Sequence, residues 1–341
     1  MKTKQYAIGI DISSEDFAVS ISTDPGIAFH GPKIFDNTTT GFKELNAWIK
    51  RLKIKPKDVV ICMEATGVYG EKLCYFLNEH RYTITVESAL KVKRSFKIDG
   101  HKTDPVDCVQ IAEYALRFYD ELNIWEPRED IVEKMQALIT TRELLVKQKT
   151  ATSNSLIALN RKAVKTVLAI KVLKDNIKII ARKIKVLEEE MENLIDRDPK
   201  VRQTVSNLKT IKGVSNLLAS NMLVVTNGFT SEKHHKKLAS YLKIVPLQHQ
   251  SGSSVYKKPR TPKYGPSIIR KLLFMAALSA VTHNPTFQKY YIRKQAEGKT
   301  KRLVINNVEN KLIKIMCAMI RDHKPFIENY HSFNPDFLIR A

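Results

Sequence analysis

The chain has 341 residues, of which 57 are Lys or Arg and 35 are Asp or Glu, so its formal charge is +22 and its pI is about 9.7. The hydrophobic share of 43% is that of a folded protein, and no apolar run approaches the roughly 20 residues that cross a bilayer. This charge argues against an enzyme of small neutral metabolites and favours nucleic acid as a polyanionic partner.

The first 130 residues predict an α/β domain with a mixed sheet. Short apolar or alternating runs predict strands at 6–11, 18–22, 27–35, 58–63 and 82–86. Helices are expected at 41–52 with Thr40 as the N-cap, at 70–80 and at 105–119. The order of elements is therefore β-β-β-α-β-α-β-α, with Asp24-Pro-Gly26 as the turn between the second and third strands.

Four acids in this domain are placed for metal chemistry. Asp11 and Glu64 lie at the ends of two predicted strands, whereas Asp104 and Asp107 are three residues apart at the start of a helix and share one face. We expect the four to converge on two Mg²⁺ or Mn²⁺ ions, which prefer oxygen ligands and can activate a phosphodiester. Each acid alone is more simply a turn or helix-start residue, but the combination has the layout of the RNase H-like fold.

Other interpretations of this domain stay open. Asp16, Asp99 and Glu113 lie near the four acids and are alternatives to them. The strand that ends in Gly9-Ile-Asp11 is also similar to the first strand of sugar kinases and actin-like ATPases. Those proteins need glycine-rich phosphate turns after this strand, and this sequence has none there. There is no Walker A motif, Rossmann glycine fingerprint or H-E-x-x-H motif.

The cysteines and the N-terminal residues bear on location. Cys62, Cys74, Cys108 and Cys317 have no C-x-x-C spacing, so neither a disulfide framework nor a zinc site is expected. The first five residues lead straight into a strand and leave no room for a signal sequence. We therefore expect a cytoplasmic, nucleoid-associated protein.

Residues 131–200 predict a helical linker. From 131 to 197 there is no Pro or Gly, and acidic residues follow basic ones along the second half of this stretch. Apolar residues recur there in a heptad pattern, at Ile170, Leu173, Ile177, Ile180, Ile184, Leu187, Met191 and Leu194. This seam predicts a coiled coil, formed either between the protomers of a dimer or tetramer or within one chain.

Residues 201–330 predict a mainly α-helical domain that binds nucleic acid. Beyond residue 130 there are 39 Lys or Arg against 15 Asp or Glu, whereas residues 1–130 hold 18 and 20. The stretch 233–296 has 13 Lys or Arg and no acid, which is unusual for an ordinary solvated surface and favours phosphate contacts. Helices are expected at 201–210, 217–225, 268–281 and 304–322.

Two motifs of this domain suggest how it contacts nucleic acid. Ile211-Lys-Gly-Val-Ser215 is similar to a helix–hairpin–helix turn, in which Lys212 and Gly213 would bind a phosphate; a plain helix–helix turn is the alternative. Ser251-Gly-Ser-Ser254 is either a flexible polar loop or a loop that carries a nucleophile, because cations that stabilise a reacting phosphate follow it. The expected phosphate-binding cations are Lys257, Lys258, Arg260, Lys263, Arg270 and Lys271.

These motifs, in this order, resemble the DEDD insertion-sequence transposases over residues 6 to about 320. The elements that carry the resemblance are Ile8-Gly-Ile-Asp11, Met63-Glu-Ala-Thr-Gly67, Lys102-Thr-Asp-Pro-Val-Asp107, Ile211-Lys-Gly-Val214, Leu238 to Pro246, Ser251-Gly252, Tyr264-Gly265 and Ile269-Arg-Lys-Leu-Leu273. The resemblance implies a RuvC-like N-terminal domain in which Asp11, Glu64, Asp104 and Asp107 hold the metal. It also implies a C-terminal transposase domain in which Ser251 attacks DNA covalently, a coiled coil that joins protomers, and guidance by a structured bridge RNA.

The sequence departs from the family pattern at three places. Lys212-Gly-Val-Ser215 replaces the usual P-G-I-G turn, and Leu242-Lys-Ile-Val245 replaces L-G-L before a proline. Gly252-Ser253 replaces a doubled glycine, so Ser253 and Ser254 remain rival nucleophiles.

The sequence as a whole predicts a transposase that cuts and rejoins DNA. Its expected domains are a metal-dependent domain at 1–130, the linker at 131–200 and the serine domain at 201–330. One alternative is a RuvC-like endonuclease of the junction-resolvase type, in which metal-activated water cuts the DNA. Another is a non-catalytic nucleic-acid-binding protein whose acids are structural.

Overall fold

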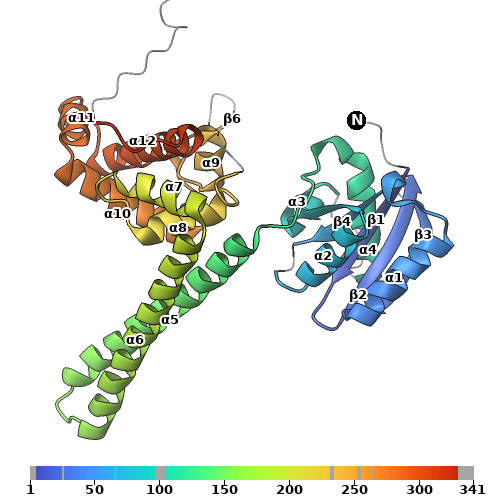
Figure 1. Ribbon diagram of the computed structural model, residues 1–341, viewed down its shortest axis with the longest axis horizontal. Coiled ribbons are helices and arrows are strands. Elements are labelled where there is room, and N and C mark those ends of the chain that lie inside the picture. Colours follow the sequence, from blue (N-terminus) through green and yellow to red (C-terminus); the bar gives the residue numbers. More distant parts are fainter. Residues whose placement is uncertain are drawn as a thin grey trace, which may run out of the picture. The chain divides into compact units, whose positions relative to one another are not determined.

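The structure is a computed structural model that describes residues 5–24, 27–65, 67–96, 104–230, 234–251, 255–262 and 265–328. It comprises two compact units, residues 1–127 and 128–341, each with its own hydrophobic core (Figure 1). None of the helices in the described ranges is long and apolar enough to cross a membrane.

A five-stranded mixed sheet forms the centre of the N-terminal unit. Its strands are β1 (Tyr6–Ile12), β2 (Asp16–Asp24), β3 (Ile27–Asp36), β4 (Val59–Glu64) and β5 (Thr83–Glu87). They lie in the order β3-β2-β1-β4-β5. The pairs β3–β2 and β2–β1 are antiparallel, and the pairs β1–β4 and β4–β5 are parallel. The predicted mixed sheet is confirmed; of the predicted turn at 24–26, Pro25 and Gly26 lie outside the described residues.

The two faces of this sheet carry different helices. Because side chains alternate along a strand, Ile8 and Ile10 enter one core with α1 (Thr39–Arg51) and α2 (Glu71–Glu79). Ala7 and Cys62 enter the other core, under α3 (Ala89–Arg94) and α4 (Asp104–Arg117) (Figure 1). The short 3₁₀ helices η1 (Pro56–Asp58) and η2 (Tyr119–Glu121) complete the unit.

The start of α1 differs from the sequence prediction. Its N-cap is Thr38, whose hydroxyl accepts a hydrogen bond from the Gly41 amide at 3.3 Å. Thr40, the predicted cap, lies inside the first turn, because the extended residue that precedes the helix is two positions earlier. The helix α3 was not predicted at all.

A long helical hairpin, here called the arm, opens the C-terminal unit. It consists of α5 (Asp130–Asn160) and α6 (Val167–Arg197), which pack along each other and are joined by residues 161–166 (Figure 1). The sequence predicted unbroken helix here. The heptad seam faces α5 of the same chain, with Ile180, Ile184 and Met191 buried, so the seam is used within one protomer.

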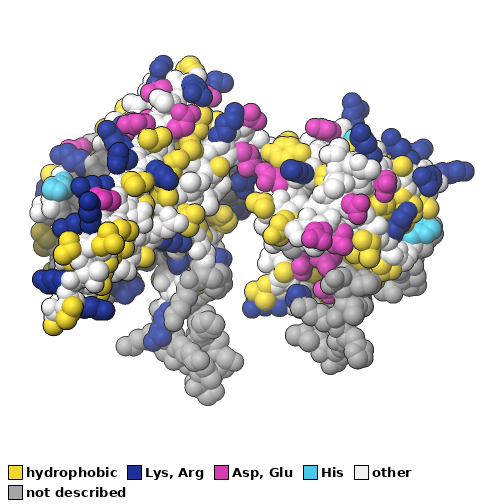
Figure 2. Space-filling view, turned by 90° about the horizontal axis from the view of Figure 1, so that it is seen from below, with side chains coloured by type: hydrophobic (Ala, Val, Ile, Leu, Met, Phe, Trp, Pro, Cys, Tyr) yellow, Lys and Arg dark blue, Asp and Glu magenta, His cyan; other side chains and the backbone are white. Residues whose placement is uncertain are grey.

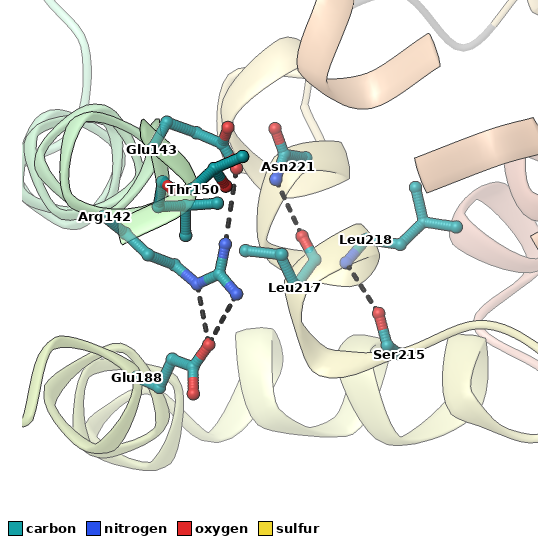
Figure 3. A network of polar contacts seen from close by, with 9 residues as sticks. Arg142, Glu143, Thr150, Glu188, Ser215, Leu217, Leu218 and Asn221 are labelled. Carbon is teal, nitrogen blue, oxygen red and sulfur yellow. Dashed lines mark hydrogen bonds and ion pairs between the residues drawn. The ribbon is translucent and has the colours of Figure 1, made fainter. Parts of the chain in front are cut away.

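A polar network holds the two arm helices together. The Arg142 guanidinium of α5 donates to the Glu188 carboxylate of α6 at 2.6 and 2.7 Å, and Glu143 lies 3.3 Å away (Figure 3). Beside it, the Ser215 hydroxyl caps α8 by accepting a hydrogen bond from the Leu218 amide at 3.3 Å (Figure 3). The arm is therefore fixed by charge as well as by its apolar seam.

The rest of the unit is mainly helical, as predicted. Its helices are α7 (Pro199–Lys209), α8 (Asn216–Val225), α9 (His235–Tyr241), α10 (Ser267–His283), α11 (Pro285–Ala296) and α12 (Lys301–Asp322). Their shared core includes Leu208, Met222, Leu273 and Leu312. The polar stretch after Pro246, for which the sequence predicts no strand, contains an antiparallel hairpin of β6 (Leu247–Ser251) and β7 (Val255–Arg260). Residues 252–254 of the predicted serine loop lie outside the described residues.

Candidate active site

Gly9 allows α4 to lie directly on β1. A Cβ atom at this position would be 2.0 Å from the carbonyl oxygen of Cys108 and 2.3 Å from the amide nitrogen of Ala112, so no side chain fits. Asp11 is two residues further along β1 and therefore points to the same face of the sheet. The close approach at Gly9 thus brings Asp11 to the first turns of α4, where Asp107 lies.

Carboxylates form a row across the ends of the parallel strands. β1 and β4 are in register up to the residues just before Asp11 and Glu64, so these two acids are neighbours on one face, with backbones about 5 Å apart. Glu64 is in turn paired with Glu87 of β5. The Glu87 carboxylate is nearly fully buried and binds the Lys91 ammonium at 3.2 Å. Sequence analysis missed Glu87, although it follows a predicted strand as Glu64 does.

Two buried thiols lie among these carboxylates. Burial, together with the charges of Asp11 and Asp107, raises the pKa of Cys108 to about 11. Burial also raises the pKa of Cys62, with the glutamates that end β5 and β4 adding to the effect. Carboxylates from β1, β4, β5 and α4 therefore act electrostatically on one small region of the sheet.

The donor set suits a hard divalent cation. Asp11, Glu64 and Asp107 offer carboxylate oxygens on one face, which Mg²⁺ prefers over nitrogen or sulfur. Asp104 begins α4, but its side chain is outside the described residues. Among the side chains that are described, no group of three or more His, Cys, Asp or Glu is close enough to hold an ion by itself.

The alternative acids have local partners. Asp16 accepts a hydrogen bond from the Ser13 hydroxyl at 2.8 Å in the turn between β1 and β2. Glu113 pairs with Arg117 one turn along α4. Asp99 lies outside the described residues.

Ser251 is the last residue of β6. Its backbone pairs with Val255 of β7, so it lies next to the tip of the hairpin, while its side chain and the residues Ser253 and Ser254 are outside the described part. Hydrogen bonds fix the chain just before and just after the hairpin. The Asn306 amide of α12 donates to the Ile244 carbonyl at 3.0 Å, and the Arg270 guanidinium of α10 donates to the Pro262 carbonyl at 2.8 Å.

A buried acid lies between these two anchors. Glu309 is one turn from Asn306 on α12 and only 6% exposed. Burial raises its pKa to about 7, against the opposing effects of Asn306, Arg302 and Arg270. Polar groups of α10 and α12 therefore contact the chain on both sides of the hairpin, and Arg270 is one of them.

The predicted phosphate-binding cations are partly described. Lys212, Arg260 and Lys271 are exposed, as the prediction requires. Gly213 has a φ of +101° and lies so close to α10 that a Cβ atom would be 2.8 Å from the Ala276 carbonyl oxygen. The side chains of Lys257 and Lys258, and all of Lys263, lie outside the described residues.

Comparison with known proteins gives the family. One family model, described as a transposase, matches residues 8–162, and a second, described as the transposase IS116/IS110/IS902 family, matches residues 205–292. The pilin gene-inverting protein of Moraxella lacunata is 30% identical over 339 residues, covering 96% of this chain and 99% of the relative. The chain belongs to the IS110 family of transposases. It is therefore a DNA transposase or recombinase, an enzyme rather than a passive nucleic-acid-binding protein.

Other relatives are similar to parts or all of this transposase. The pilin gene-inverting protein of Moraxella bovis is also 30% identical over 96% of the chain. The insertion element IS110 uncharacterized 43.6 kDa protein of Streptomyces coelicolor is 27% identical over 138 residues, which cover 40% of this chain and 33% of the relative. A structure of Thermus thermophilus RuvC aligns with 35% of this chain and 99% of its own length, at 9% identity and a TM-score of 0.28.

The contact at Gly9 gives a test of how the transposase builds its site. Gly9→Ala should lower the free energy of unfolding by about 2 kcal/mol, because the new methyl group overlaps backbone atoms of α4 and forces that helix away from β1. Cleavage of DNA should fall with it as α4 shifts from Asp11. Gly31→Ala in β3 is the matched control, since no heavy atom lies within 4 Å of its added Cβ. Thermal denaturation and a cleavage assay measure both effects, and equal stability of the two variants would contradict the contact.

Proposed function

We propose that this transposase cuts and rejoins DNA with Mg²⁺ held by Asp11, Glu64, Asp104 and Asp107 and with a serine of the C-terminal unit as nucleophile. The observation that carries the proposal is the position of Asp11 and Glu64, side by side where α4 begins. The strand order β3-β2-β1-β4-β5, with its carboxylates at the ends of parallel strands, supports an RNase H-like domain of the RuvC type.

The carboxylates orient the reacting phosphate. Two bound Mg²⁺ ions supply Lewis-acid stabilisation of the attacking and leaving oxygens of the phosphodiester. Asp11 and Glu64, which end neighbouring strands, and Asp104 and Asp107, which lie in the first turn of α4, would hold these ions. Because α4 is locked to β1 at Gly9, the ligands keep their spacing without help from the rest of the chain.

Ser251 conserves the energy of the cut bond. Its oxygen forms a bond to phosphorus, the DNA hydroxyl on the other side of the phosphodiester leaves with the proton, and a second DNA hydroxyl later displaces the serine. Neighbouring cations at Lys257, Lys258 and Arg260 stabilise the charge on the phosphate. The anchored hairpin base supports this role, because hydrogen bonds fix the chain on both sides of the hairpin.

DNA and a guide RNA are the proposed partners. The excess of Lys and Arg beyond residue 130 provides phosphate contacts, at Lys212, Lys263 and Lys271 among others. Figure 2 shows Lys and Arg side chains, in dark blue, spread over the surface of the C-terminal unit. Two relatives are named for inverting the pilin gene, and inversion requires strands to be rejoined as well as cut. The bridge RNA follows from the family resemblance. In this scheme the metal domain is 1–130, the linker 131–200 and the serine domain 201–330.

A RuvC-like endonuclease that cuts with metal-activated water is the second candidate. The carboxylate row favours it, because these carboxylates all lie in the N-terminal unit and a water mechanism needs no serine. The two candidates differ in their products, since hydrolysis leaves free ends and transfer leaves joined strands.

A plasmid assay separates the two candidates. The gene's flanking DNA, including any adjoining noncoding segment, is placed on one plasmid and a target on a second, and the products are sequenced. Joined strands that form with Mg²⁺ and disappear with EDTA are expected. Cut ends without any joined product would favour the endonuclease, and absence of both would contradict the proposed function.

The exposed face of the arm is the proposed surface for self-association into a dimer or tetramer. Val172, Ile179 and Val186 are spaced seven residues apart on α6 and are 56%, 44% and 62% exposed, so they form a stripe separate from the buried seam. α6 is basic in its first half and acidic in its second. An antiparallel pair of α6 helices would therefore match opposite charges along the stripe.

Replacing Ile179 and Val186 by Asp should give a monomer of unchanged melting temperature, because both side chains are exposed within the protomer. Replacing the buried pair Ile180 and Ile184 by Asp should instead melt the arm, since each charge would enter an apolar seam. Light scattering and circular dichroism measure the two outcomes. A wild type that is monomeric with and without nucleic acid would rule out the stripe as an interface.

A further inference from the structure

The N-terminal unit has a pocket between α3 and α4 that neither the proposed metal site nor the serine hairpin uses. Its volume is about 370 Å³, within the range of pockets that take small ligands or single nucleotides. α3 and its N-cap contribute polar and cationic groups, and α4 and the residue after it contribute aromatic ones. The lining that matters here is Ser88, Lys91, Arg94, Tyr114 and Phe118.

The pocket is adjacent to the row of carboxylates. Lys91 lines it and also binds Glu87, the strand-end neighbour of Glu64. Because neighbouring strands are about 4.8 Å apart, the end of β5 is two such spacings, about 10 Å, from Asp11. A DNA strand whose phosphodiester reacts at Asp11 and Glu64 can therefore reach the pocket within a short run of nucleotides.

The charges of α3 suit a phosphate. Residues 1–130 carry no excess of cations, with 18 Lys or Arg against 20 Asp or Glu, yet α3 holds Lys91, Lys93 and Arg94 and no acid. Cationic side chains beside the carboxylate row provide attraction for the phosphates that flank the reacting one. The ammonium of Lys91 is held by its ion pair with Glu87, whose side chain is 6% exposed. Arg94 lines the same pocket and is exposed.

The other wall of the pocket suits a sugar or base. Tyr114 is 1% exposed and forms its floor, with the Lys91 ammonium 5.6 Å from the centre of the ring. Phe118 is half-buried at the end of α4, so part of its ring can receive a flat base. Glu121 also lines the pocket, at the η2 end, and would keep the phosphate on the α3 side.

We propose that this pocket binds one nucleotide of the DNA strand next to the phosphodiester that reacts. Arg94 and Lys91 contact its phosphate, and Phe118 contacts its base or sugar. The assignment rests on the proposed function for the location of the reacting phosphodiester, but binding in the pocket can be measured without any reaction.

Photocrosslinking of the full chain tests the proposal. The probe is a short oligothymidylate that contains 5-iodouracil, with Ca²⁺ in place of Mg²⁺, and crosslinked peptides are mapped after irradiation. The wild type should give crosslinks to the peptide that contains Tyr114 and Phe118, in addition to those of the C-terminal unit. Crosslinks confined to the C-terminal unit would overturn the assignment. Crosslinks at the pocket peptide that form with the matching oligouridylate but not with DNA would overturn it as well.

Variants of α3 make the test specific. Arg94→Ala should reduce this crosslink about tenfold, as expected for loss of a charge-assisted phosphate contact. Lys93→Ala is the matched control, because it removes the same charge from the same helix outside the pocket lining. Ser88→Trp fills the pocket, keeps every charge and removes no side-chain cap hydrogen bond, so it should also lose the crosslink.

The outcomes separate this proposal from the proposed function. The pocket assignment would be overturned if Arg94→Ala and Lys93→Ala crosslink equally. If the wild type still recombines DNA normally, the proposed function would stand. A second outcome would contradict the proposed function but support the pocket assignment. In it, the wild type crosslinks at the pocket, Arg94→Ala loses that crosslink, and the wild type gives no recombination.

Discussion

Replacing Asp11 by Asn should reduce DNA strand cleavage by at least about a hundredfold while leaving the fold intact. The amide keeps the shape of the carboxylate but not its charge, so the metal loses a ligand and the neighbouring carboxylates lose a shared cation. Asp11 is half-buried at the end of β1, where an amide can still be hydrated, so stability should change little. Cleavage of labelled DNA in Mg²⁺ and a thermal denaturation curve measure the two effects.

A nearby acid provides the control for this substitution. Asp16→Asn changes an exposed turn residue of the same sheet, with a local partner in Ser13, and should leave cleavage within about twofold of the wild type. Chelation by EDTA should reproduce the Asp11→Asn defect in the wild type. Wild-type cleavage by purified Asp11→Asn would remove Asp11 from the site, and a defect in Asp16→Asn of the same size would show that the choice between the two acids was wrong.

The N-terminal sheet could be predicted because its strands are short runs of apolar or alternating residues bounded by turns. Each strand of the parallel part sends every second side chain into one of two cores, and the predicted strands match the observed ones to within about two residues. The same alternation placed Asp11 and Glu64 on one face. Glu87 carries the same signal, since it follows a predicted strand as Glu64 does, and it pairs with Glu64.

The C-terminal unit shows what pattern alone cannot determine. The heptad seam was visible, but a seam does not specify its partner, and α5 of the same chain occupies it. The reversal at 161–166 has no Pro or Gly to mark it. Likewise β6 and β7 contain Gln, Ser, Lys and Pro rather than an apolar or alternating run, so they carry little strand signal. The chain on either side of the hairpin is anchored by Asn306 and Arg270, which are distant in sequence.

Ser251→Ala should abolish the covalent protein–DNA adduct and lower recombination to background, while binding of DNA stays within about twofold of the wild type. The reason is that alanine has no oxygen to bond to phosphorus, whereas the cations that follow the hairpin tip are untouched. Denaturing electrophoresis of labelled DNA after the reaction detects the adduct, and peptide mapping locates it. Ser253→Ala and Ser254→Ala are the matched controls, since each removes one hydroxyl from the same loop. An adduct that persists in Ser251→Ala and disappears in one of these controls would move the nucleophile to that serine, and recombination without any adduct in the wild type would exclude a serine mechanism.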